Sequence, residues 1–457
     1  MPARILVVDD EPAFLDSMRR GLLLSGFTQV RVESNPLAAA SLLEKGEVFD
    51  VALLDITMPQ MDGVELLTVI KNHSPHTECI MVTAVNEAGY AVASLKKGAF
   101  DYVLKPVSLE DLVQTIDRAL ERKRLLDILE IEKKTSIPEL ENPGAFAEII
   151  TGAPKMVRIL REAELHAASN VPILITGESG TGKELLAQAI HRASPRAGKR
   201  FTPINMTFPG TALFESEFFG HTKGAFTGAD KERQGLLEYT EGGTLFMDEI
   251  GNLSPELQGK LLRVLQEGEF FKLGTHKPRK VDVRFVAATN ADLESLLAQG
   301  LFRKDFYYRL RGAWLHLPPL RERKEDIPRL AKKFLEEFTP GPRDREVDGQ
   351  TLNLLLAYDY PGNIRELKSI LQAAVNLAKG RQLSSHLLPK FFREKISAKE
   401  LARQSASPEP IMPLAAMEKN YILNVYRQTG RNKSRTALLL GLGLNTLRRK
   451  LQSYGEE

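Results

Sequence analysis

Cysteine is nearly absent from this 457-residue chain, which has one, Cys79. A single cysteine cannot form an internal disulfide, so disulfide-stapled secreted folds are excluded and a reducing compartment is favoured. Long apolar stretches are absent too: no run of 18 or more apolar residues occurs, and the first residues lack the basic start and apolar core of a signal peptide. Internal repeats and low-complexity tracts are also missing. These absences predict a soluble, cytoplasmic protein without a membrane segment.

The chain as a whole has no large excess of positive or negative charge, but its two end segments do. The 62 Lys+Arg and 59 Asp+Glu side chains give a net charge of +3. Residues 1–120 carry ten basic and seventeen acidic side chains, whereas residues 414–457 carry eight basic and three acidic ones. This division predicts that only the basic end meets a polyanion such as DNA.

The order of apolar runs and helix breakers divides the chain into three domains and two linkers. Short buried strands alternate with helical patterns in residues 1–120 and predict a doubly wound α/β domain with a parallel sheet. Residues 121–145 are expected to form a helical linker, either a short coiled coil or a solvated connector. A second α/β domain is predicted over 146–392, a linker over 393–413, and an all-α domain over 414–457.

Polar side chains follow the strands of the first domain at the points where the strands end. Asp9 and Asp10 follow ILVV, Asp55 follows VALL, and Thr83 and Lys105 end the next two strands. Because the carboxyl ends of parallel strands meet at one edge of a sheet, we expect these groups to lie close together. Three carboxylates at one edge repel each other unless a hard cation neutralises them, which predicts Mg²⁺.

The second domain carries two signatures of ATP binding. In ILITGESGTGKE an apolar strand leads into a glycine-rich loop and a helix, so that backbone N–H groups close around phosphates and Lys183 reaches the β/γ oxygens. Glu184 occupies the place where the standard motif has a Ser or Thr. The segment GGTLFMDEI supplies a strand ending in Asp248 and Glu249, for the metal and for polarising water. The predicted ATP-binding residues are Gly177, Glu178, Ser179, Gly180, Thr181, Gly182, Lys183 and Glu184.

Further polar residues of this domain fall in four stretches. VRFVAATN ends a strand in Thr289 and Asn290, close to the expected γ-phosphate. LFRKDFYYRL places Arg303 and Arg309 six residues apart, and YPGNIREL carries Arg365. The stretch LPPLRERKEDI also contains arginines, and LRERK on its own is typical of a solvated face.

One phenylalanine, Phe226, lies in GHTKGAFTGADKERQG among small and polar residues that cannot bury it. Two interpretations are open from the local sequence. The ring either folds back onto its own domain or is exposed on a loop that engages a partner.

The basic end has the periodicity of three short helices. Asn432 is placed to cap the second helix, with Ala437, Leu438 and Leu440 toward the core. The last helix is expected to enter the major groove of DNA, the alternative being a basic dimerisation helix. The predicted DNA contacts are Asn445, Thr446, Arg448, Arg449 and Lys450.

These segments together resemble bacterial regulatory families over nearly the whole chain. The first domain is similar to the receiver domain of two-component response regulators. GESGTGKE, GAFTGA, DEI and the FR…RL…LPPLRER block resemble the AAA+ domain of sigma-54-dependent, NtrC-like activators, which also have Glu at the position of Glu184. The basic end resembles a Fis-type helix-turn-helix. The resemblance implies a receiver, an AAA+ P-loop α/β domain with a helical lid over about 320–392, and a C-terminal all-α helix-turn-helix domain.

The receiver resemblance implies a role for each polar group at the strand ends. Asp55 would accept a phosphoryl group, and Lys105 would pair with the phosphoryl oxygens. Thr83 and Tyr102 would form the switch. The residues implied to hold Mg²⁺ are Asp9, Asp10, Asp55 and, through its carbonyl, Thr57.

The activator resemblance implies roles in ATP hydrolysis and in sigma-54 contact. Asp248 would coordinate Mg²⁺, Glu249 would activate the attacking water, and Asn205 would hold Glu249 back until the γ-phosphate is sensed. The catalytic set is completed by Thr289, Asn290, the trans-acting fingers Arg303 and Arg309, and Arg365 as the second sensor. The loop for sigma-54 comprises Gly224, Ala225, Phe226, Thr227, Gly228 and Ala229, which favours the exposed interpretation of Phe226.

The function implied is that of a response regulator and ATPase that activates transcription. After phosphorylation on Asp55 by a sensor histidine kinase, dimers would assemble into a hexamer or heptamer and remodel sigma-54 RNA polymerase from inverted-repeat enhancer DNA. One alternative is a DNA-binding repressor or regulator that keeps the AAA+ fold for assembly only. A degenerate GAFTGA or a lost Arg303 would favour it, and both are present. A second alternative, another AAA+ remodelling enzyme with an adaptor domain, leaves the GAFTGA loop unexplained.

Overall fold

The computed structural model describes residues 3–84, 88–133, 137–207, 211–227, 229–338, 347–378, 383–390, 392–394 and 413–456. The chain divides into two units, Met1–Leu388 and Pro389–Glu457. Gly228 of the GAFTGA segment and most of the second predicted linker lie outside the described residues. Within the described ranges, no helix is both long and apolar enough to cross a membrane.

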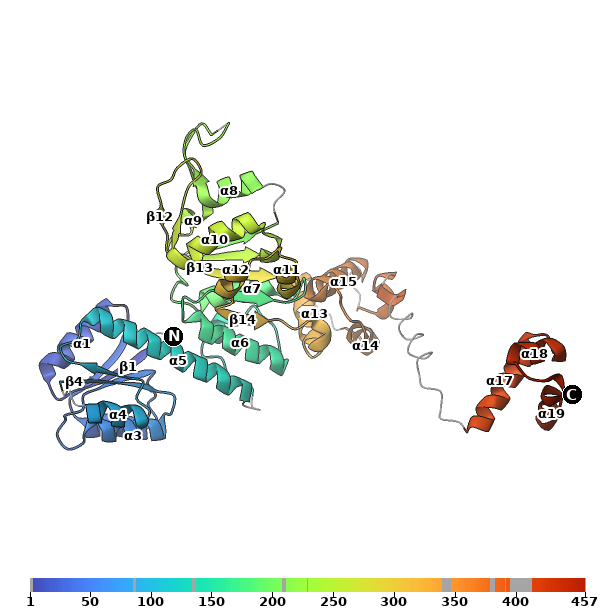
Figure 1. Cartoon of the computed structure of the whole chain (residues 1–457), viewed down its shortest axis with the longest axis horizontal. Helices are drawn as coiled ribbons and strands as arrows, with labels where there is room; N and C mark the ends of the chain where they lie inside the picture. The colour runs from blue at the N-terminus through green and yellow to red at the C-terminus, as the bar shows by residue number, and fades with distance from the viewer. Residues whose placement is uncertain are drawn as a thin grey trace. The chain divides into compact units, whose positions relative to one another are not determined.

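The first sheet has five parallel strands in the order β2-β1-β3-β4-β5. The strands are β1 (Arg4–Val8), β2 (Gln29–Glu33), β3 (Val51–Leu54), β4 (Glu78–Thr83) and β5 (Asp101–Leu104). The helices are α1 (Pro12–Leu24), α2 (Pro36–Glu44), α3 (Gly63–His73), α4 (Ala88–Lys96) and α5 (Leu109–Lys133). Figure 1 shows α1 and α5 on one side of this sheet and α3 and α4 on the other. The predicted doubly wound domain is therefore confirmed.

Alternating side chains of the buried strands fill two separate cores. Leu6 and Val8 of β1 pack toward α2 and α3, whereas Ile5 and Val7 pack toward α1 and α5. Successive residues of a strand point to opposite faces, so both faces of a doubly wound sheet must be apolar. This requirement explains the uninterrupted apolar runs of the sequence.

Helix α5 continues past the predicted end of the first domain at residue 120. Leu112, Ile116 and Ala119 of its first half are buried against the sheet. Leu129 in its second half is 49% exposed. The predicted boundary therefore falls inside one continuous helix.

The second sheet also has five parallel strands, in the order β14-β6-β13-β10-β7. Its strands are β6 (Ile173–Thr176), β7 (Phe201–Asn205), β10 (Thr244–Asp248), β13 (Arg284–Thr289) and β14 (Ala313–His316). One face is covered by α6 (Pro154–Ala167), α7 (Lys183–Arg192) and η1 (Pro143–Phe146). The other face is covered by α8 (Thr211–Phe219), α9 (Leu236–Tyr239), α10 (Pro255–Glu267), α11 (Leu293–Ala298) and α12 (Lys304–Leu310).

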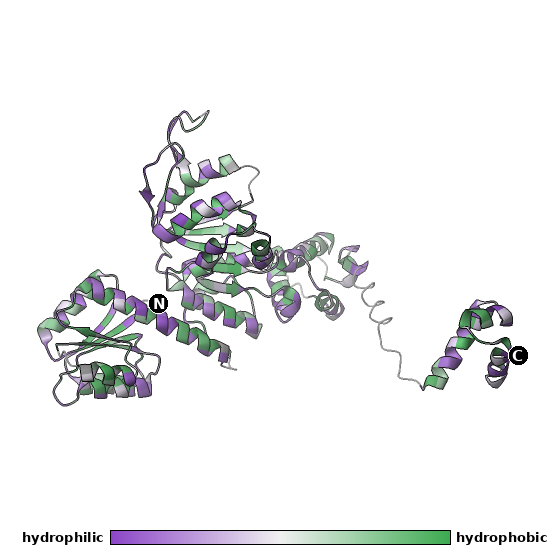
Figure 2. Ribbon diagram, in the orientation of Figure 1, coloured by the Kyte–Doolittle hydropathy of each residue, from purple (hydrophilic) through white to green (hydrophobic). Residues whose placement is uncertain are grey.

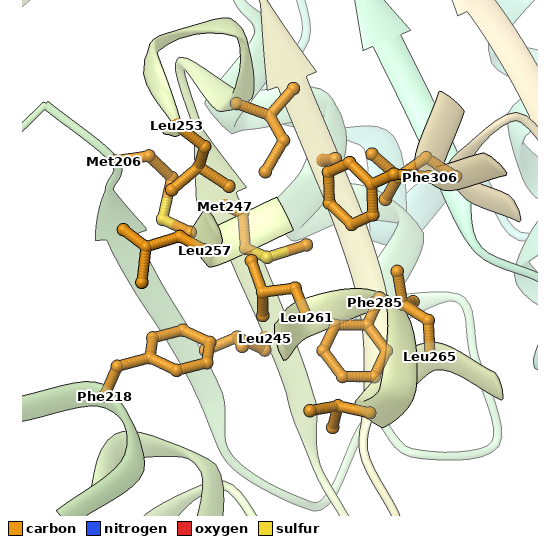
Figure 3. Close-up of a cluster of buried hydrophobic side chains, with 14 of the residues drawn as sticks. Met206, Phe218, Leu245, Met247, Leu253, Leu257, Leu261, Leu265, Phe285 and Phe306 are labelled. Carbon is orange, nitrogen blue, oxygen red and sulfur yellow. The ribbon is translucent and has the colours of Figure 1, made fainter. Parts of the chain in front are cut away.

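A hydrophobic core joins the second sheet to α8, α10 and α12 (Figure 3). Leu245 and Met247 of β10 lie there beside Phe218 of α8 and Leu261 of α10. All four side chains are completely buried. Residues that follow these strands are thus held by a packed interior.

Short strands and a group of helices complete the second domain. Two-stranded pairs form between β8 (Gly220–His221) and β9 (Arg233–Gln234), and between β11 (Glu269–Phe270) and β12 (Arg279–Lys280). A short helix, η2 (Ile250–Asn252), follows β10. The lid contains η3 (Leu320–Glu322), α13 (Asp326–Phe338), α14 (Gly349–Ala357), α15 (Asn363–Ala378) and η4 (Ser385–Leu387).

The second unit is a small three-helix domain made of α17 (Leu414–Gln428), α18 (Lys433–Leu440) and α19 (Leu444–Ser453). Ala437 lies in its core, and the side chain of Asn432 accepts a hydrogen bond from the Arg435 N–H, which confirms the predicted cap. Leu438 was predicted to face the core and is 82% exposed. The core-facing side of α18 carries Thr436 and Ala437, which are buried, and Leu440, which is partly buried. Because each helical residue turns about 100° around the axis, Leu438 lies about 200° from Thr436 and faces away from the core. Figure 2 shows how apolar and polar residues alternate along these helices.

Candidate functional site

The ends of β1 and β3 bring three carboxylates together in the first domain. Ligand oxygens of Asp9, Asp10 and Asp55 all lie within 4.8 Å of one another. Asp9 and Asp55 are buried, whereas Asp10 is exposed. Lys105, which follows β5, donates through Nζ to Asp9 Oδ2 at 2.6 Å and to Asp55 Oδ2 at 2.9 Å.

The electrostatics of this pocket suit a divalent cation. Burial raises the pKa of the Asp9 carboxyl, against the lowering effect of Lys105. Burial by itself lowers the pKa of Lys105, but its hydrogen bonds to Asp9 and Asp55 outweigh that effect and raise it. Three carboxylates and one ammonium leave two negative charges uncompensated. Hard oxygen ligands with that excess charge match Mg²⁺.

The groups around the pocket hold Lys105 and Asp55 in place. The ring of Phe14 lies 4.2 Å below the Lys105 ammonium, within cation–π distance. Asp55 Oδ1 accepts hydrogen bonds from the N–H groups of Ile56 at 2.6 Å and Thr57 at 3.4 Å. The other carboxylate oxygen, Oδ2, therefore contacts only the lysine among the hydrogen bonds described.

The predicted switch residues occupy the two neighbouring strands. Thr83 is buried at the end of β4, and its carbonyl accepts a hydrogen bond from the Lys105 N–H at 2.9 Å. Tyr102 lies half-buried in β5, packed against the core. The Lys105–Pro106 peptide bond is cis.

The second domain forms a phosphate-binding loop between β6 and α7. Gly177, Gly180 and Gly182 have positive φ angles of 152°, 77° and 105°. A Cβ on Gly180 would lie 2.4 Å from the carbonyl oxygen of Gly362, so the approach of the lid requires glycine there. Lys183 is buried, and Nζ donates to the carbonyls of Gly177 at 2.9 Å and Glu178 at 3.2 Å.

The surroundings of this loop also bear on its chemistry. Burial lowers the pKa of Lys183, against the raising effects of Glu249 and Asp248. Glu184 lies exposed in the first turn of α7. The indole N–H of Trp314 donates to Thr176 Oγ1 at 2.8 Å, directly before Gly177.

The ends of β7, β10 and β13 lie beside this loop and carry the other predicted polar groups. Glu249 has a φ of 55° and accepts a hydrogen bond from the Asn290 N–H at 3.3 Å. Thr289 is buried at the end of β13. Asn205 pairs with Asp248 in strand register, and its Oδ1 accepts from the Thr207 N–H at 2.8 Å. None of the hydrogen bonds described joins Asn205 to Glu249, so that contact stays a prediction.

The predicted arginines have partners away from Glu249. Arg303 directly precedes α12, at its N-cap position, and forms an exposed ion pair with Asp305 at 2.7 Å. Arg309 donates to the Leu265 carbonyl at 3.2 Å. Arg365 donates to Ser179 Oγ at 3.0 Å and lines a hollow of about 370 Å³ beside the phosphate-binding loop.

Three residues that contact the phosphate-binding loop were missed by the sequence reasoning. Arg321 donates to both carboxylate oxygens of Glu178, at 2.6 and 2.9 Å. Buried Arg323 donates to the Thr181 carbonyl at 2.7 Å, and fully buried Asn363 donates to Glu178 Oε2 at 3.1 Å. The arginines belong to LRERK, which on its own is typical of a solvated face. The asparagine of YPGN offered a signal in the sequence, because Asn after Pro-Gly is one of the few residues that tolerate a positive φ. In the structure its φ is 50°.

The described residues of the GAFTGA segment, 224–227 and 229, lie in a turn between β8 and β9. The Gly224 N–H donates to the Ala229 carbonyl at 2.9 Å, and the Ala229 N–H donates to the Phe226 carbonyl at 3.0 Å. Thr227 is exposed, and the Ala225 N–H donates to Thr222. The Phe226 ring is 45% exposed and meets the ring of His221 edge-on, with centroids 5.0 Å apart. Phe226 therefore has one covered side and one open side.

The last helix of the second unit carries the predicted DNA contacts. Asn445, Thr446, Arg448 and Arg449 are exposed on α19. Lys450 is half-buried, and Nζ donates to Glu418 Oε2 of α17 at 2.7 Å, which raises the pKa of Lys450. The ion pair occupies the lysine within the domain, whereas the arginines face solvent.

Four family models match the chain from end to end. They are described as response regulator receiver domain (residues 5–117), sigma-54 interaction domain (149–316), AAA+ ATPase lid domain (321–405) and bacterial regulatory protein, Fis family (413–454). The first two cover the acidic pocket and the phosphate-binding loop with its neighbouring strands. The last covers α17–α19.

The chain is also similar over its whole length to named bacterial regulators. It is 41% identical over 456 residues to regulatory protein AtoC of Escherichia coli, covering 99% of this chain and 98% of that protein. It is 37% identical over 481 residues to the DNA-binding transcriptional regulator NtrC of Salmonella typhimurium, covering 99% of both. The crystal structure of NtrX from Brucella abortus with ADP aligns over 100% of both chains, with a TM-score of 0.51 and 30% identity.

Proposed function

This chain belongs to the sigma-54-dependent response regulators of the NtrC type, and from that membership we propose that it is a phosphorylation-controlled ATPase that remodels sigma-54 RNA polymerase. It is a two-component response regulator with a receiver, an ATP-binding AAA+ domain and a Fis-type helix-turn-helix. The proposal adds ATP hydrolysis, Mg²⁺, ring assembly and the roles of individual residues.

The observation that carries the proposal is the GAFTGA turn, which leaves one side of Phe226 open on a domain that also binds nucleotide. Its stem, β8, directly follows α8, whose Phe218 packs in the core under β10. Since β10 ends in Asp248 and Glu249 directly follows it, the loop and the hydrolytic residues are held by the same packed core. A change at the nucleotide therefore has a mechanical route to Phe226.

In the receiver, we assign the nucleophile to Asp55. An oxygen of its carboxylate attacks the phosphorus of a kinase phosphohistidine, an O–P bond forms, and the P–N bond breaks with its electron pair going to the imidazole. Lys105 follows the phosphoryl oxygens, exchanging its carboxylate contacts for them. Mg²⁺ held by Asp9, Asp10, Asp55 and the Thr57 carbonyl would supply further positive charge there.

In the AAA+ domain, we assign Glu249 as the general base. It takes a proton from water, whose oxygen attacks the γ-phosphorus while the bond to the β-γ bridging oxygen breaks and ADP leaves. Lys183 and the loop N–H groups bind the phosphates, Asp248 would hold Mg²⁺, and Asn290 orients Glu249. Thr289, Asn205 and Arg365 surround this centre.

Hydrolysis by this arrangement requires a second copy of the chain. Arg303 and Arg309 have partners on α12 and α10 of their own chain, Asp305 and the Leu265 carbonyl, and not at Glu249. We propose that they stabilise the γ-phosphate of the neighbouring subunit in a hexamer or heptamer. The sensor histidine kinase, sigma-54 polymerase and enhancer DNA are the proposed partners, with Arg448 and Arg449 on the DNA.

The experiment that tests the proposal is open-complex formation at a sigma-54 promoter with an upstream binding site. Phosphorylated full-length protein with ATP and Mg²⁺ should open the promoter, whereas protein without ATP should not. A promoter read by another sigma factor serves as the control and should not respond. Equal opening without ATP, or repression in its place, would identify a DNA-binding regulator that uses the AAA+ fold only for assembly.

A further inference from the structure

The carboxylate of Glu178 connects the phosphate-binding loop to the lid. Arg321 of η3 binds both of its oxygens, and the arrangement of two parallel hydrogen bonds is the strongest form of such a pair. Asn363, the first residue of α15, donates to the same carboxylate at 3.1 Å. A side chain of the loop is therefore held by two separate segments of the lid.

The side chain of Asn363 makes hydrogen bonds to both the phosphate-binding loop and the lid. Its Nδ2 also donates to the Ser179 carbonyl at 3.0 Å, and its Oδ1 accepts from the Leu320 N–H at 2.8 Å. The side chain is fully buried, and the Ile364 N–H adds a hydrogen bond to the Gly180 carbonyl at 3.0 Å. A buried amide with all its groups satisfied permits only one arrangement of its neighbours.

The backbone of Glu178 meets the residue that binds phosphate. Lys183 Nζ donates to the Glu178 carbonyl at 3.2 Å and to the Gly177 carbonyl at 2.9 Å. Phosphate oxygens are stronger acceptors for an ammonium than peptide carbonyls. Bound nucleotide therefore draws Lys183 away from Glu178, and the peptide that loses this donor carries the carboxylate held by the lid.

We propose that Glu178 is a positioning residue that transmits nucleotide occupancy from Lys183 to the lid through Arg321 and Asn363. The inference rests on the proposed ATPase function and adds a route by which the lid responds to the nucleotide. It differs from the role of Arg365, which binds the hydroxyl of Ser179 and not the carboxylate.

The test is amide hydrogen exchange of α13 and α15 in the full chain, with and without ADP and Mg²⁺. In the wild type, ADP should change the exchange rates of these helices. We measure the ratio of the exchange rates without and with ADP. Glu178→Gln and Arg321→Met should each reduce this ratio by about tenfold, the factor that corresponds to the free energy of one charge-assisted hydrogen bond. The double variant should lose no more than either single variant, because both remove the same contact.

A matched control is available within the lid. Lys368 and Glu337 form an ion pair at 2.7 Å with side-chain exposures of 42% and 48%, close to the 39% and 41% of Arg321 and Glu178. Lys368→Met removes an ion pair of similar exposure that does not touch the phosphate-binding loop. Its response to ADP should equal that of the wild type.

The role of Asn363 is tested by exchanging the amide and the carboxylate between positions 363 and 178. Asn363→Asp tolerates the same backbone conformation but places a carboxylate against Glu178, so ADP affinity should fall by about tenfold. Adding Glu178→Gln removes the repulsion and should restore affinity to within about threefold. If Asn363→Asp does not fold, the variants at the half-exposed positions 178 and 321 decide the question.

The outcomes separate this inference from the function on which it rests. A Glu178→Gln protein that binds ADP and shows the wild-type change in lid exchange would overturn the inference. Additive losses in the double variant Glu178→Gln/Arg321→Met would do the same. A wild-type chain that binds no ADP would refute the proposed ATPase.

Discussion

Replacing Phe226 by alanine tests whether its ring contacts a partner or belongs to the core of the domain. Full burial of a phenylalanine contributes about 1.5–3 kcal/mol. Because 45% of Phe226 is exposed, its burial should contribute about 1–1.5 kcal/mol, and its edge contact with His221 about 0.5 kcal/mol more. The variant should therefore lose about 1.5–2 kcal/mol of unfolding free energy, a melting shift of about 3–8 °C for a domain of this size.

The matched control is Phe218→Ala, on the helix that leads to the same loop. Phe218, which is labelled in Figure 3, is completely buried. Its ring packs against the rings of Phe214 and Phe219. Its removal should cost about 3–5 kcal/mol because it leaves a cavity. Calorimetry of the full chain gives both values, read from the transition that moves to higher temperature when ADP is added.

The functional assays complete this prediction. Phe226→Ala should keep ATP turnover and DNA binding, since Phe226 belongs neither to the phosphate-binding loop nor to the predicted DNA-contact residues of α19. Open-complex formation at a sigma-54 promoter should fail. If Phe226→Ala melts as low as Phe218→Ala and loses ATP turnover in parallel, the ring belongs to the core and the assignment of a sigma-54 contact is wrong.

Three further predictions concern the two sites. Asp55→Asn should not be labelled by radioactive acetyl phosphate with Mg²⁺, because an amide cannot form the acyl phosphate; persistent labelling would place the acceptor elsewhere. Glu249→Gln should bind ATP but hydrolyse it about 10²–10⁴-fold more slowly, because the amide cannot act as a general base. Mixing it with Arg303→Ala should restore part of the turnover, since each interface takes a base from one subunit and an arginine from the other. If mixing restores no turnover, the arginines do not act in trans. The hydrogen bonds from Arg321 and then Asn363 lower the pKa of Glu178, so the junction with the lid should be fully stabilising at neutral pH and weaken as the pH falls through that lowered pKa. Protection of the lid amides, taken relative to the exchange rate of an unstructured peptide at each pH, should therefore fall more on acidification in the wild type than in Glu178→Gln; an identical fall in both would contradict this prediction.

The parts of the fold and site that the sequence predicted depend on local patterns. Uninterrupted apolar runs identified β1, β3, β4 and β5 of the first sheet and β6, β10 and β13 of the second. The strands β2, β7 and β14 are not continuous buried runs and were not identified. Asp55 could be assigned because it directly follows such a run, and Lys183 because it ends the glycine-rich loop that follows one. Parallel topology then brings the strand ends together without any knowledge of packing. The pocket of Asp9, Asp10 and Asp55 could therefore be predicted from the positions of these residues at the strand ends.

The parts that could not be predicted depend on contacts between distant segments. Asn363 and Glu178 are 185 residues apart, and nothing next to either residue indicates the other. The end of α5 was equally hidden, because the helical pattern of residues 109–133 does not change where the domain's core ends. Leu438 was assigned to the core from its apolar character alone, whereas the helix phase decides which of two adjacent apolar residues is buried.

The hydrogen bond between Trp314 and Thr176 gives the unmodified protein an optical signal at its nucleotide site. Trp314 is the one tryptophan of the sequence, and its indole N–H is bound to the residue directly before the phosphate-binding loop. Indole fluorescence changes in wavelength and intensity with hydrogen bonding and hydration. The tryptophan emission of the whole 457-residue chain therefore originates beside Gly177, and we expect it to report the filling and emptying of the loop in real time without a dye or a label.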